Sequence, residues 1–211
     1  MSNATILMLI AGGWGGYFLL HSLLASQAIK GRFSRQRCYR LSYNLIALIT
    51  LLPLIWLHTL YRGQMVIQWQ PPWTWLAGFM SLAALACFLW TLRYYDLGEF
   101  SGWRTCRDGR NDVTEGRLVI SPPHRYVRHP WYSCALVLIW CHDMDLAQLL
   151  TATLLSVYLV IGSRLEERRL IDEYGDQYRE YIKSVPGLIP LPWKRLSREK
   201  ADRLMSRMPP D

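Results

Sequence analysis

The sequence predicts an all-α polytopic membrane protein with about five transmembrane helices. Of its 211 residues, 51% are hydrophobic and only 19% are charged. The hydrophobic residues form four uncharged blocks, each close to the roughly 20 residues that a helix needs to cross a bilayer. A surface helix of a soluble protein would keep a charged face. The connectors between the blocks are basic, which also fits a membrane protein.

The blocks are taken in chain order. The four long ones are Ala4–Leu24, Leu41–Leu60, Trp73–Leu92 and Leu146–Ser163. A fifth block, Trp131–His142, is shorter and ends in polar residues. Runs of this length are more often re-entrant or buried than fully spanning. We expect it to form the first leg of a C-terminal helical hairpin whose second leg is the last long block.

Basic residues alternate between the connectors in a way that orients the chain. The connector after the first block is basic and contains no acid, whereas the connector 61–72 carries only Arg62 as a basic residue. The third connector is basic again, with Arg93, Arg104, Arg107, Arg110, Arg117, Arg125 and Arg128. Because basic loops stay cytoplasmic, we expect five crossings, an external N-terminus and a cytoplasmic C-terminus, as in a protein of the bacterial inner membrane.

The net charge and the cysteine spacing argue against a nucleic-acid-binding protein and against a metal-binding or disulfide-rich one. The formal net charge of +8 comes largely from the connectors, whereas nucleic-acid binding needs basic and aromatic residues interleaved on one exposed face. We therefore exclude a nucleic-acid partner. The cysteines show no CxxC spacing, so metal and disulfide sites are weakly indicated, and we expect no metal and inert thiols at Cys38, Cys87, Cys106, Cys134 and Cys141.

A dense polar cluster, RYVRHPWY at residues 125–132, directly precedes the short block. Pro130 disfavours a helical backbone at His129 and suits the first turn of a helix, so a helix is expected to begin at Pro130. Arg128 and His129 then stand beside a helix N-terminus, where free N–H groups favour anions, and Tyr132 follows within the same turn. Such a corner suits a carboxylate or a phosphate.

Charged residues gather again where the last block ends, in SRLEERRL at residues 163–170. One interpretation of arginines such as Arg164 is an ordinary helix end that meets lipid headgroups. The paired acids Glu166 and Glu167 gain nothing from an anionic leaflet. They would be useful to a bound molecule that offers an ammonium group or sugar hydroxyls. Together the two clusters suit a zwitterionic cofactor that carries hydroxyls.

The tail after the last block is expected to continue as a helix to about Tyr174 and to turn at Gly175. A short amphipathic helix should follow and stop at Pro186, because proline ends helices. This tail would form a cytoplasmic cap.

These stretches resemble the integral-membrane methyltransferases related to isoprenylcysteine carboxyl methyltransferase and phospholipid N-methyltransferase. Members of that superfamily show RHPxY, a hairpin, R-x-EE-x-x-L and a tyrosine-containing ending that closes on V-P. The resemblance covers residues 120–190, and the order and spacing make it specific. The matching residues are Arg128, His129, Pro130, Tyr132, Arg164, Glu166, Glu167, Leu170, Gly175, Tyr178, Tyr181, Val185, Pro186 and Pro190.

The resemblance implies an enzyme that binds S-adenosylmethionine in a cytoplasm-facing pocket under the C-terminal segment. The cofactor-binding residues that it implies are His124, Tyr126, His129, Tyr132 and Glu167. The residues that it implies for catalysis and for ordering the pocket are Arg128, Arg164 and Glu166. We expect a single domain over residues 1–211, with three spans in 1–92 and the cofactor-binding loop, hairpin and cap in 93–190.

The first half adds a likeness to one branch of the superfamily. HSLLAS (21–26), YRLSYN (39–44) and YDLGEFSGWR (95–104) are similar to the thiol methyltransferase and nitric-oxide-reductase-associated branch. We therefore expect a small or lipid-like thiol, or an isoprenylcysteine-type acid, as the methyl acceptor. No acid lies in the first three blocks to guide an amine, and the arginines around Arg104 and Arg128 would attract a thiolate.

Two other hypotheses stay open. Sterol-type membrane reductases share a similar C-terminal region and use NADPH. A non-catalytic membrane component of a respiratory assembly is also possible, because Pro122-Pro123-His124 replaces the Gly-Pro-Tyr that is usual before the RHP motif. His21 in the first block is either an acceptor-side group or the partner in a hydrogen bond between helices.

Overall fold

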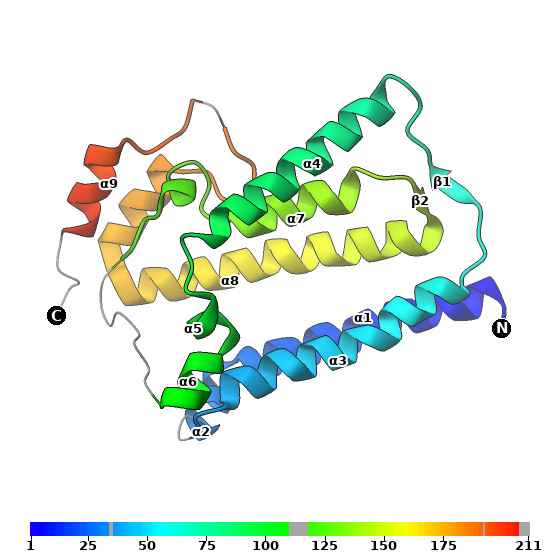
Figure 1. Cartoon of the computed structure of the whole chain (residues 1–211), viewed down its shortest axis with the longest axis horizontal. Helices are drawn as coiled ribbons and strands as arrows, with labels where there is room; N and C mark the ends of the chain where they lie inside the picture. Colours follow the sequence, from blue (N-terminus) through cyan, green and yellow to red (C-terminus); the bar gives the residue numbers. More distant parts are fainter. Residues whose placement is uncertain (34–35, 110–117, 192, 207–211) are drawn as a thin grey trace. The chain divides into compact units, whose positions relative to one another are not determined.

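The computed structural model describes residues 1–33, 36–109, 118–191 and 193–206 (Figure 1). Arg110 and Arg117, which were counted in the third connector, lie outside the described residues. The chain separates into two compact units, which are described one at a time. The first unit comprises Met1–Gln70, Tyr95–Asp112 and Asp143–Leu155, and the second comprises Pro71–Tyr94, Val113–His142 and Ser156–Asp211.

Four long apolar helices confirm the predicted all-α polytopic membrane fold. They are α1 (Asn3–Ala25), α3 (Tyr39–Leu60), α4 (Trp73–Leu92) and α8 (Leu146–Ser184), and a shorter apolar helix is α7 (Pro130–Trp140). The remaining elements are α2 (Gln27–Phe33), β1 (Met65–Ile67), α5 (Leu97–Ser101), α6 (Trp103–Asp108), the 3-10 helix η1 (Pro122–Arg125), β2 (Met144–Asp145) and α9 (Arg198–Met205).

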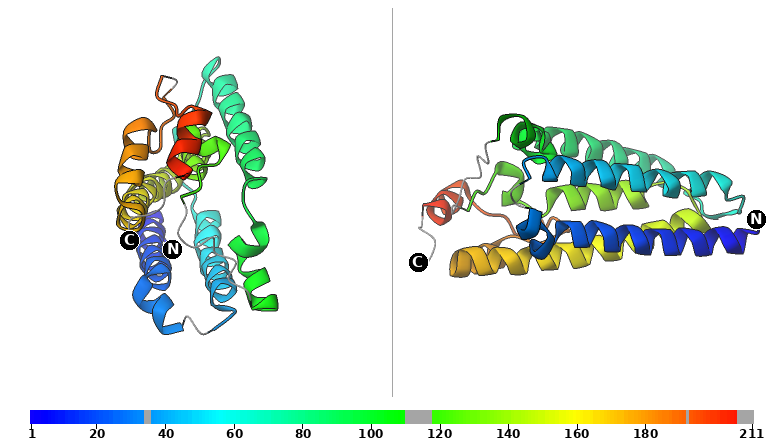
Figure 2. Two further views of the ribbon diagram at one scale, coloured as in Figure 1. Left: turned by 90° about the vertical axis from the view of Figure 1, so that its left-hand side faces the viewer. Right: turned by 90° about the horizontal axis from the view of Figure 1, so that it is seen from below.

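In the first unit, α1 and α3 lie side by side (Figures 1 and 2). A small core forms where Ile10 and Trp14 of α1 meet Leu54 of α3 and Ala147 at the start of α8. Many apolar side chains of these helices are exposed instead, for example Leu48 and Ile49. A helix that is hydrophobic all round belongs in lipid, so this outward surface is the one that the bilayer covers.

Polar groups between the helices of the first unit have partners. His21 Nε2 and the Tyr43 hydroxyl lie 2.6 Å apart, which supports the interhelical hydrogen bond as the role of His21. Trp14 Nε1 donates to Thr151 Oγ1 at 2.9 Å, and His58 Nε2 lies 2.9 Å from the same hydroxyl. Such bonds hold spans together where water is absent.

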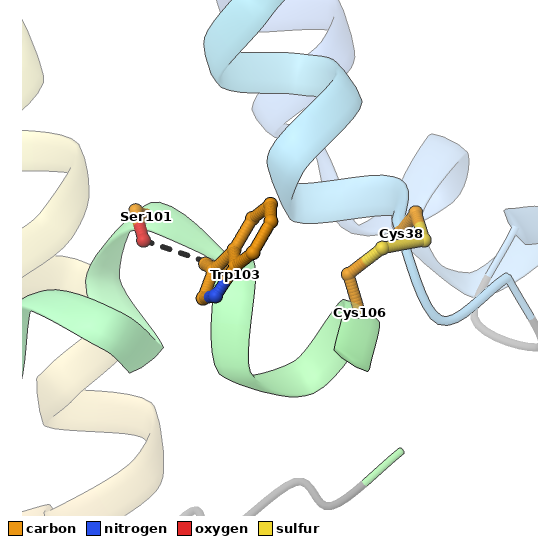
Figure 3. Close-up of a disulfide and its surroundings, with 4 residues drawn as sticks. All are labelled: Cys38, Ser101, Trp103 and Cys106. Atoms are coloured by element: carbon orange, nitrogen blue, oxygen red, sulfur yellow. Dashed lines mark hydrogen bonds between the residues drawn. A yellow bond between two sulfur atoms is a disulfide. The ribbon is translucent and has the colours of Figure 1, made fainter. Parts of the chain in front are cut away.

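At the start of α3, a disulfide joins Cys38, which precedes this helix, to Cys106 of α6 (Figure 3). The prediction that all five cysteines are inert thiols is therefore wrong for this pair. It failed because the two positions are 68 residues apart and only tertiary structure brings them together. Cys87, Cys134 and Cys141 are free thiols, as expected.

The α5–α6 junction packs directly on the start of α3. Gly102 has a φ of 79°, and a Cβ there would meet the backbone nitrogen of Leu41 at 2.6 Å. Only glycine combines this backbone conformation with such a close approach. Asn44 of α3 also donates from Nδ2 to the carbonyl oxygen of Ser101 at 3.0 Å.

In the second unit, α4 and α7 lie side by side (Figures 1 and 2). Trp131 Nε1 donates to Thr91 Oγ1 at 2.8 Å near one end, and Ser81 Oγ donates to the Cys141 carbonyl at 3.2 Å near the other. With 11 residues, α7 rises about 16 Å, roughly half the hydrocarbon thickness of a bilayer. The helix starts at Pro130, as predicted, and the polar residues after Trp140 continue the chain toward the start of α8.

The predicted bend of the tail is confirmed. α8 is a long helix with one non-helical residue, Gly175 at φ 57° and ψ −132°, and it ends at Ser184, just before Pro186. The left-handed φ favours glycine. The returning segment packs in a core with α9, whose members include Tyr178, Tyr181, Val185, Leu196, Ala201 and Leu204.

Candidate active site

The RHP turn is fixed by backbone hydrogen bonds to the segment that follows α8. Arg128 N donates to the Pro186 carbonyl at 2.9 Å, and His129 N donates to the Gly187 carbonyl at 3.1 Å. His129 has a non-helical backbone (φ −122°, ψ 71°), and Pro130 opens α7. The fixed φ of Pro130 and its restriction of His129 therefore determine the local conformation of the turn. The segment 185–187 stabilises the turn by accepting the two backbone hydrogen bonds.

Arg128 forms the centre of a half-buried polar cluster, defined here as Arg128, His129, Glu166 and Glu167. Its Nε and Nη2 atoms lie 2.8 and 2.7 Å from Glu167 Oε1. Its Nη1 donates to the carbonyl oxygens of Ile182, at 3.1 Å, and Val185. Ile182 lies in the last turn of α8 and Val185 directly follows that helix, where no intrahelical donor remains for these carbonyls. The Arg128 and Glu167 side chains are only 10% and 17% exposed.

His129 lies between the two carboxylates of the polar cluster. Its Nε2 is 3.1 Å from Glu167 Oε1 and its Nδ1 is 3.4 Å from Glu166 Oε2, and its side chain is 6% exposed. Burial favours the neutral ring, but hydrogen bonds and charges from Glu166 and Glu167 outweigh it and raise the pKa of His129. When it is protonated, His129 joins Arg128 in balancing the two acids.

Tyr132 and His124 border the polar cluster. The Tyr132 ring stacks on His129, with centroids 5.4 Å apart and planes at 12°. His124 lies in η1, where Nδ1 is 2.7 Å from Ser121 Oγ. Burial lowers the pKa of His124 to about 4, helped by the positive charge of His129 and partly opposed by Glu166. His124 is therefore a neutral neighbour of His129 at neutral pH.

Two predicted site residues stand apart from the polar cluster. The Arg164 side chain is exposed on α8, and none of the hydrogen bonds or ion pairs found among the described residues involves it. Tyr126 is 48% exposed and lines an apolar cavity instead. The structure thus brings together Arg128, His129, Tyr132, Glu166, Glu167 and His124.

Sequence reasoning assigned no role to several residues that position the site. Ser133 Oγ donates to the Leu188 carbonyl at 2.5 Å, and the Tyr181 hydroxyl donates to the His124 carbonyl at 2.6 Å. At Gly187, a Cβ would lie 3.2 Å from Arg128 Nη2. Tyr181 and the V-P pair were visible as motif matches, but the sequence could not show which groups they contact.

The expectation that free arginines attract a thiolate is not supported. Arg128 is committed to Glu167 and to α8 carbonyls, and Arg104 is paired with Asp96 at the start of α5. Glu99 lies 4.0 Å from Arg40. Because each charge is paired within the chain, neither arginine remains as an isolated cation for a thiolate.

An apolar cavity of about 570 Å³ adjoins the RHP turn within the second unit. Its walls come from α4, from α7 and from the Leu188–Pro190 segment, and they include the thiols of Cys87 and Cys134. Val127 and Pro130 line it, while the intervening Arg128 and His129 reach toward α8. The cavity and the polar cluster therefore lie on two sides of one turn.

The residues present fit a zwitterionic, hydroxyl-bearing cofactor. Glu166 is 51% exposed. In the described part of the chain, the groups that bond Glu167 all lie at Oε1, which leaves Oε2 to accept from a ligand. A carboxylate accepts hydrogen bonds from ammonium and hydroxyl groups, and an aromatic ring such as that of Tyr132 can face a cation.

Fold and site together define a polytopic membrane protein with a half-buried polar cluster beside the start of α7. The profile of the NnrU protein family matches residues 8–190. The chain therefore belongs to the NnrU protein family, and the membrane methyltransferase resemblance drawn from its motifs is confirmed by the relatives described next.

Several relatives carry the same name. The chain is 30% identical to methanethiol S-methyltransferase 1 of Bradyrhizobium diazoefficiens, over 83% of the chain and 63% of that protein. It is 27% identical to methanethiol S-methyltransferase of Crocosphaera subtropica (92% and 78% covered) and 29% identical to that of Mycobacterium tuberculosis (84% and 75%). The chain thus spans less than two thirds of the first of these relatives. No solved structure matches the chain.

Proposed function

We propose that this protein transfers a methyl group from S-adenosylmethionine to a small thiol at the boundary between membrane and cytosol. The relatives named methanethiol S-methyltransferase support the reaction class. The observation that carries the proposal is the polar cluster, in which two carboxylates surround a buried histidine beside the start of α7. The orientation expected from the basic connectors would give the cluster access to a cytosolic cofactor.

When bound, S-adenosylmethionine would supply an electrophilic methyl group on its sulfonium sulfur. Glu166 and the free oxygen of Glu167 would accept hydrogen bonds from its ammonium group or ribose hydroxyls. Tyr132 would face the sulfonium, with its ring held in place by the stack on His129. Arg128 acts as a positioning residue, because it orients Glu167 and joins the RHP turn to the end of α8.

The apolar cavity supports a neutral, weakly polar acceptor. A thiol is soluble in such a cavity, whereas a cationic amine would lose its hydration there without a carboxylate to replace it. Thiol methylation requires the sulfur to be unprotonated, so the acceptor would react as the small thiolate fraction that a thiol forms by losing its proton to water. The chain's main contribution would then be alignment of the two reactants and exclusion of water.

The test uses the purified protein in lipid nanodiscs with S-adenosylmethionine labelled in its methyl group. Methanethiol, a prenylated cysteine analogue and phosphatidylethanolamine compete as acceptors, and label in dimethyl sulfide is the expected result. Transfer to the phospholipid alone would contradict the thiol proposal.

Binding is measured separately from turnover. Titration calorimetry with S-adenosylmethionine and with NADPH distinguishes a methyltransferase from a reductase, and binding of neither would favour a non-catalytic component. Glu166→Gln, which leaves the Arg128–Glu167 pair intact, should weaken S-adenosylmethionine binding. The matched control is Glu173→Gln on the exposed part of α8.

A further inference from the structure

The disulfide between Cys38 and Cys106 lies where small molecules can reach it. Cys38 is exposed just before α3, and Cys106 is partly exposed in α6 (Figure 3). Their Cα atoms are 4.3 Å apart. None of the residues of the polar cluster or of the apolar cavity belongs to this site.

The basic connectors create a conflict with a permanent disulfide. Cys38 and Cys106 sit in the two connectors that carry the arginines, and the proposed orientation places both connectors in the cytosol. Cytosolic thiols keep cysteines reduced, and the disulfides that do form there are usually transient, catalytic or redox-sensing. A pair held at bonding distance on that side is therefore suited to reversible chemistry.

We propose that Cys38 and Cys106 form a reversible exchange site for low-molecular-weight thiols and disulfides. The inference rests on the orientation given under the proposed function, but not on methyl transfer. In the opening direction, a thiolate attacks one of the two protein sulfurs, breaks the Cys38–Cys106 bond and releases the other cysteine as thiolate. A second thiolate attacks the resulting mixed disulfide and leaves as a small disulfide, which releases the remaining cysteine. Two electrons pass from the two small thiolates to the protein, and the reverse steps close the bond again.

The surroundings favour exchange. Arg37 precedes Cys38, and its guanidinium group reaches Gly109 at the end of α6, where a Cβ would be 3.3 Å away. Positive charge near a leaving sulfur favours the departing thiolate, and Arg37 carries such a charge on the residue adjacent to Cys38. Cys38 is exposed, which leaves the disulfide within reach of a small thiol.

Opening the bond is expected to loosen α6 more than α5. No side chain of α6 is buried, so the disulfide is its main attachment to the start of α3. α5 keeps the Asn44 bonds to the Phe100 and Ser101 carbonyls at 3.3 and 3.0 Å and the Arg40 contact with Glu99. The redox state of the pair would thus set the mobility of the segment that carries YDLGEFSGWR.

The experiment equilibrates the full-length protein in nanodiscs with mixtures of reduced and oxidised glutathione. Thiols are trapped with N-ethylmaleimide, and peptide mass spectrometry measures the linked Cys38–Cys106 peptide. We expect the linked fraction to fall at least tenfold from the oxidised to the reduced end of the series. Hydrogen–deuterium exchange should then rise in residues 103–109 and change less in 97–101.

Matched variants and cell labelling make the proposal falsifiable. Cys38→Ser should show the exchange pattern of the reduced protein in every mixture, whereas Cys141→Ser, a change at a free cysteine outside the apolar cavity, should behave like wild type. A pair that stays linked in the fully reduced mixture, or that never links in the oxidised one, overturns the proposal. So does labelling of both cysteines in intact cells by a membrane-impermeant maleimide after reduction, because it would place the disulfide outside the cytosol.

Discussion

The two units differ in the interactions that hold the ends of their helices near the arginine-rich connectors. In the first unit a covalent bond between Cys38 and Cys106 is accompanied by exposed ion pairs such as Arg104–Asp96. In the described part of the second unit the corresponding contacts are non-covalent, and the Arg128–Glu167 pair is largely buried. One unit therefore depends on a bond that redox chemistry can open, and the other on charges that protons and substitutions can unbalance.

This difference decides where substitutions should matter. Exposed ion pairs are screened by water and contribute little to stability. Removing one member of a buried pair leaves an uncompensated charge, which is costly. Precise placement of functional groups is thus expected around Arg128, where the groups that hold the fold also hold the proposed ligand site.

The largest effect is expected from Arg128→Met. The variant keeps an unbranched side chain, but it leaves Glu167 without its main partner and the last α8 carbonyls without a donor. Removing one partner of a buried pair costs about 3–5 kcal/mol, so denaturant unfolding in detergent should show a loss of that size. Arg104→Met removes an exposed pair on α6 and should leave the free energy of unfolding nearly unchanged. Equal losses in the two variants would contradict the distinction between the units.

A smaller effect is expected from Glu167→Gln. Gln keeps the shape and can still accept one hydrogen bond, but it lacks the charge that pairs with Arg128 and with a ligand ammonium. Losing a charged partner costs about 1.5–3 kcal/mol, so calorimetry should show S-adenosylmethionine binding weakened about tenfold or more. Circular dichroism of the same sample establishes whether the helices remain. Wild-type affinity in a folded variant would remove Glu167 from the proposed ligand site.

The fold could be predicted because its main determinants are short stretches of sequence. These are the long apolar runs that form helices and the proline and glycine residues that begin or bend them. Pro130 opens α7 and Gly175 bends α8 as expected, since both residues act through their own backbone angles. The Cys38–Cys106 bond could not be predicted in this way. Its two residues have no common motif, and they meet where the α5–α6 junction approaches α3 closely at Gly102.

The sequence predicted several residues of the polar cluster, but it could not predict which groups they contact. Motif matches named His129, Glu166 and Glu167, which the structure brings together. The sequence could not show that Arg128 is occupied by α8 carbonyls, because a motif records residue types and not their partners. Arg164 has the same motif support, yet it lies exposed and apart from the polar cluster.

The apolar cavity should set acceptor size. At about 30 Å³ for each water-sized group, a cavity of about 570 Å³ has far more room than methanethiol needs. Ala83 lines the cavity, and Ala86 is exposed on the same helix outside it. Ala83→Phe should lower kcat/KM for butanethiol and octanethiol by about tenfold, a typical loss when a pocket no longer fits a few methylenes. Methanethiol methylation should change little, and Ala86→Phe should alter neither. Equal losses for short and long thiols in Ala83→Phe would show that the cavity does not hold the acceptor chain.

The smallest effect is expected from the titration of His129. Its pKa is raised in the folded protein by Glu166 and Glu167 against the opposing effect of burial. The stabilisation is therefore complete below the unfolded-state pKa of about 6.5 and is lost as the pH rises through the folded-state pKa. Because Glu166 is half exposed, water screens part of this interaction. Thermal unfolding between pH 6 and pH 9 should show wild type losing stability on the alkaline side, and His129→Gln should show a flatter profile over that range. His142→Gln, a change at an exposed histidine, should retain the wild-type slope, and an unchanged slope in His129→Gln would mean that the imidazolium does not hold the two carboxylates together.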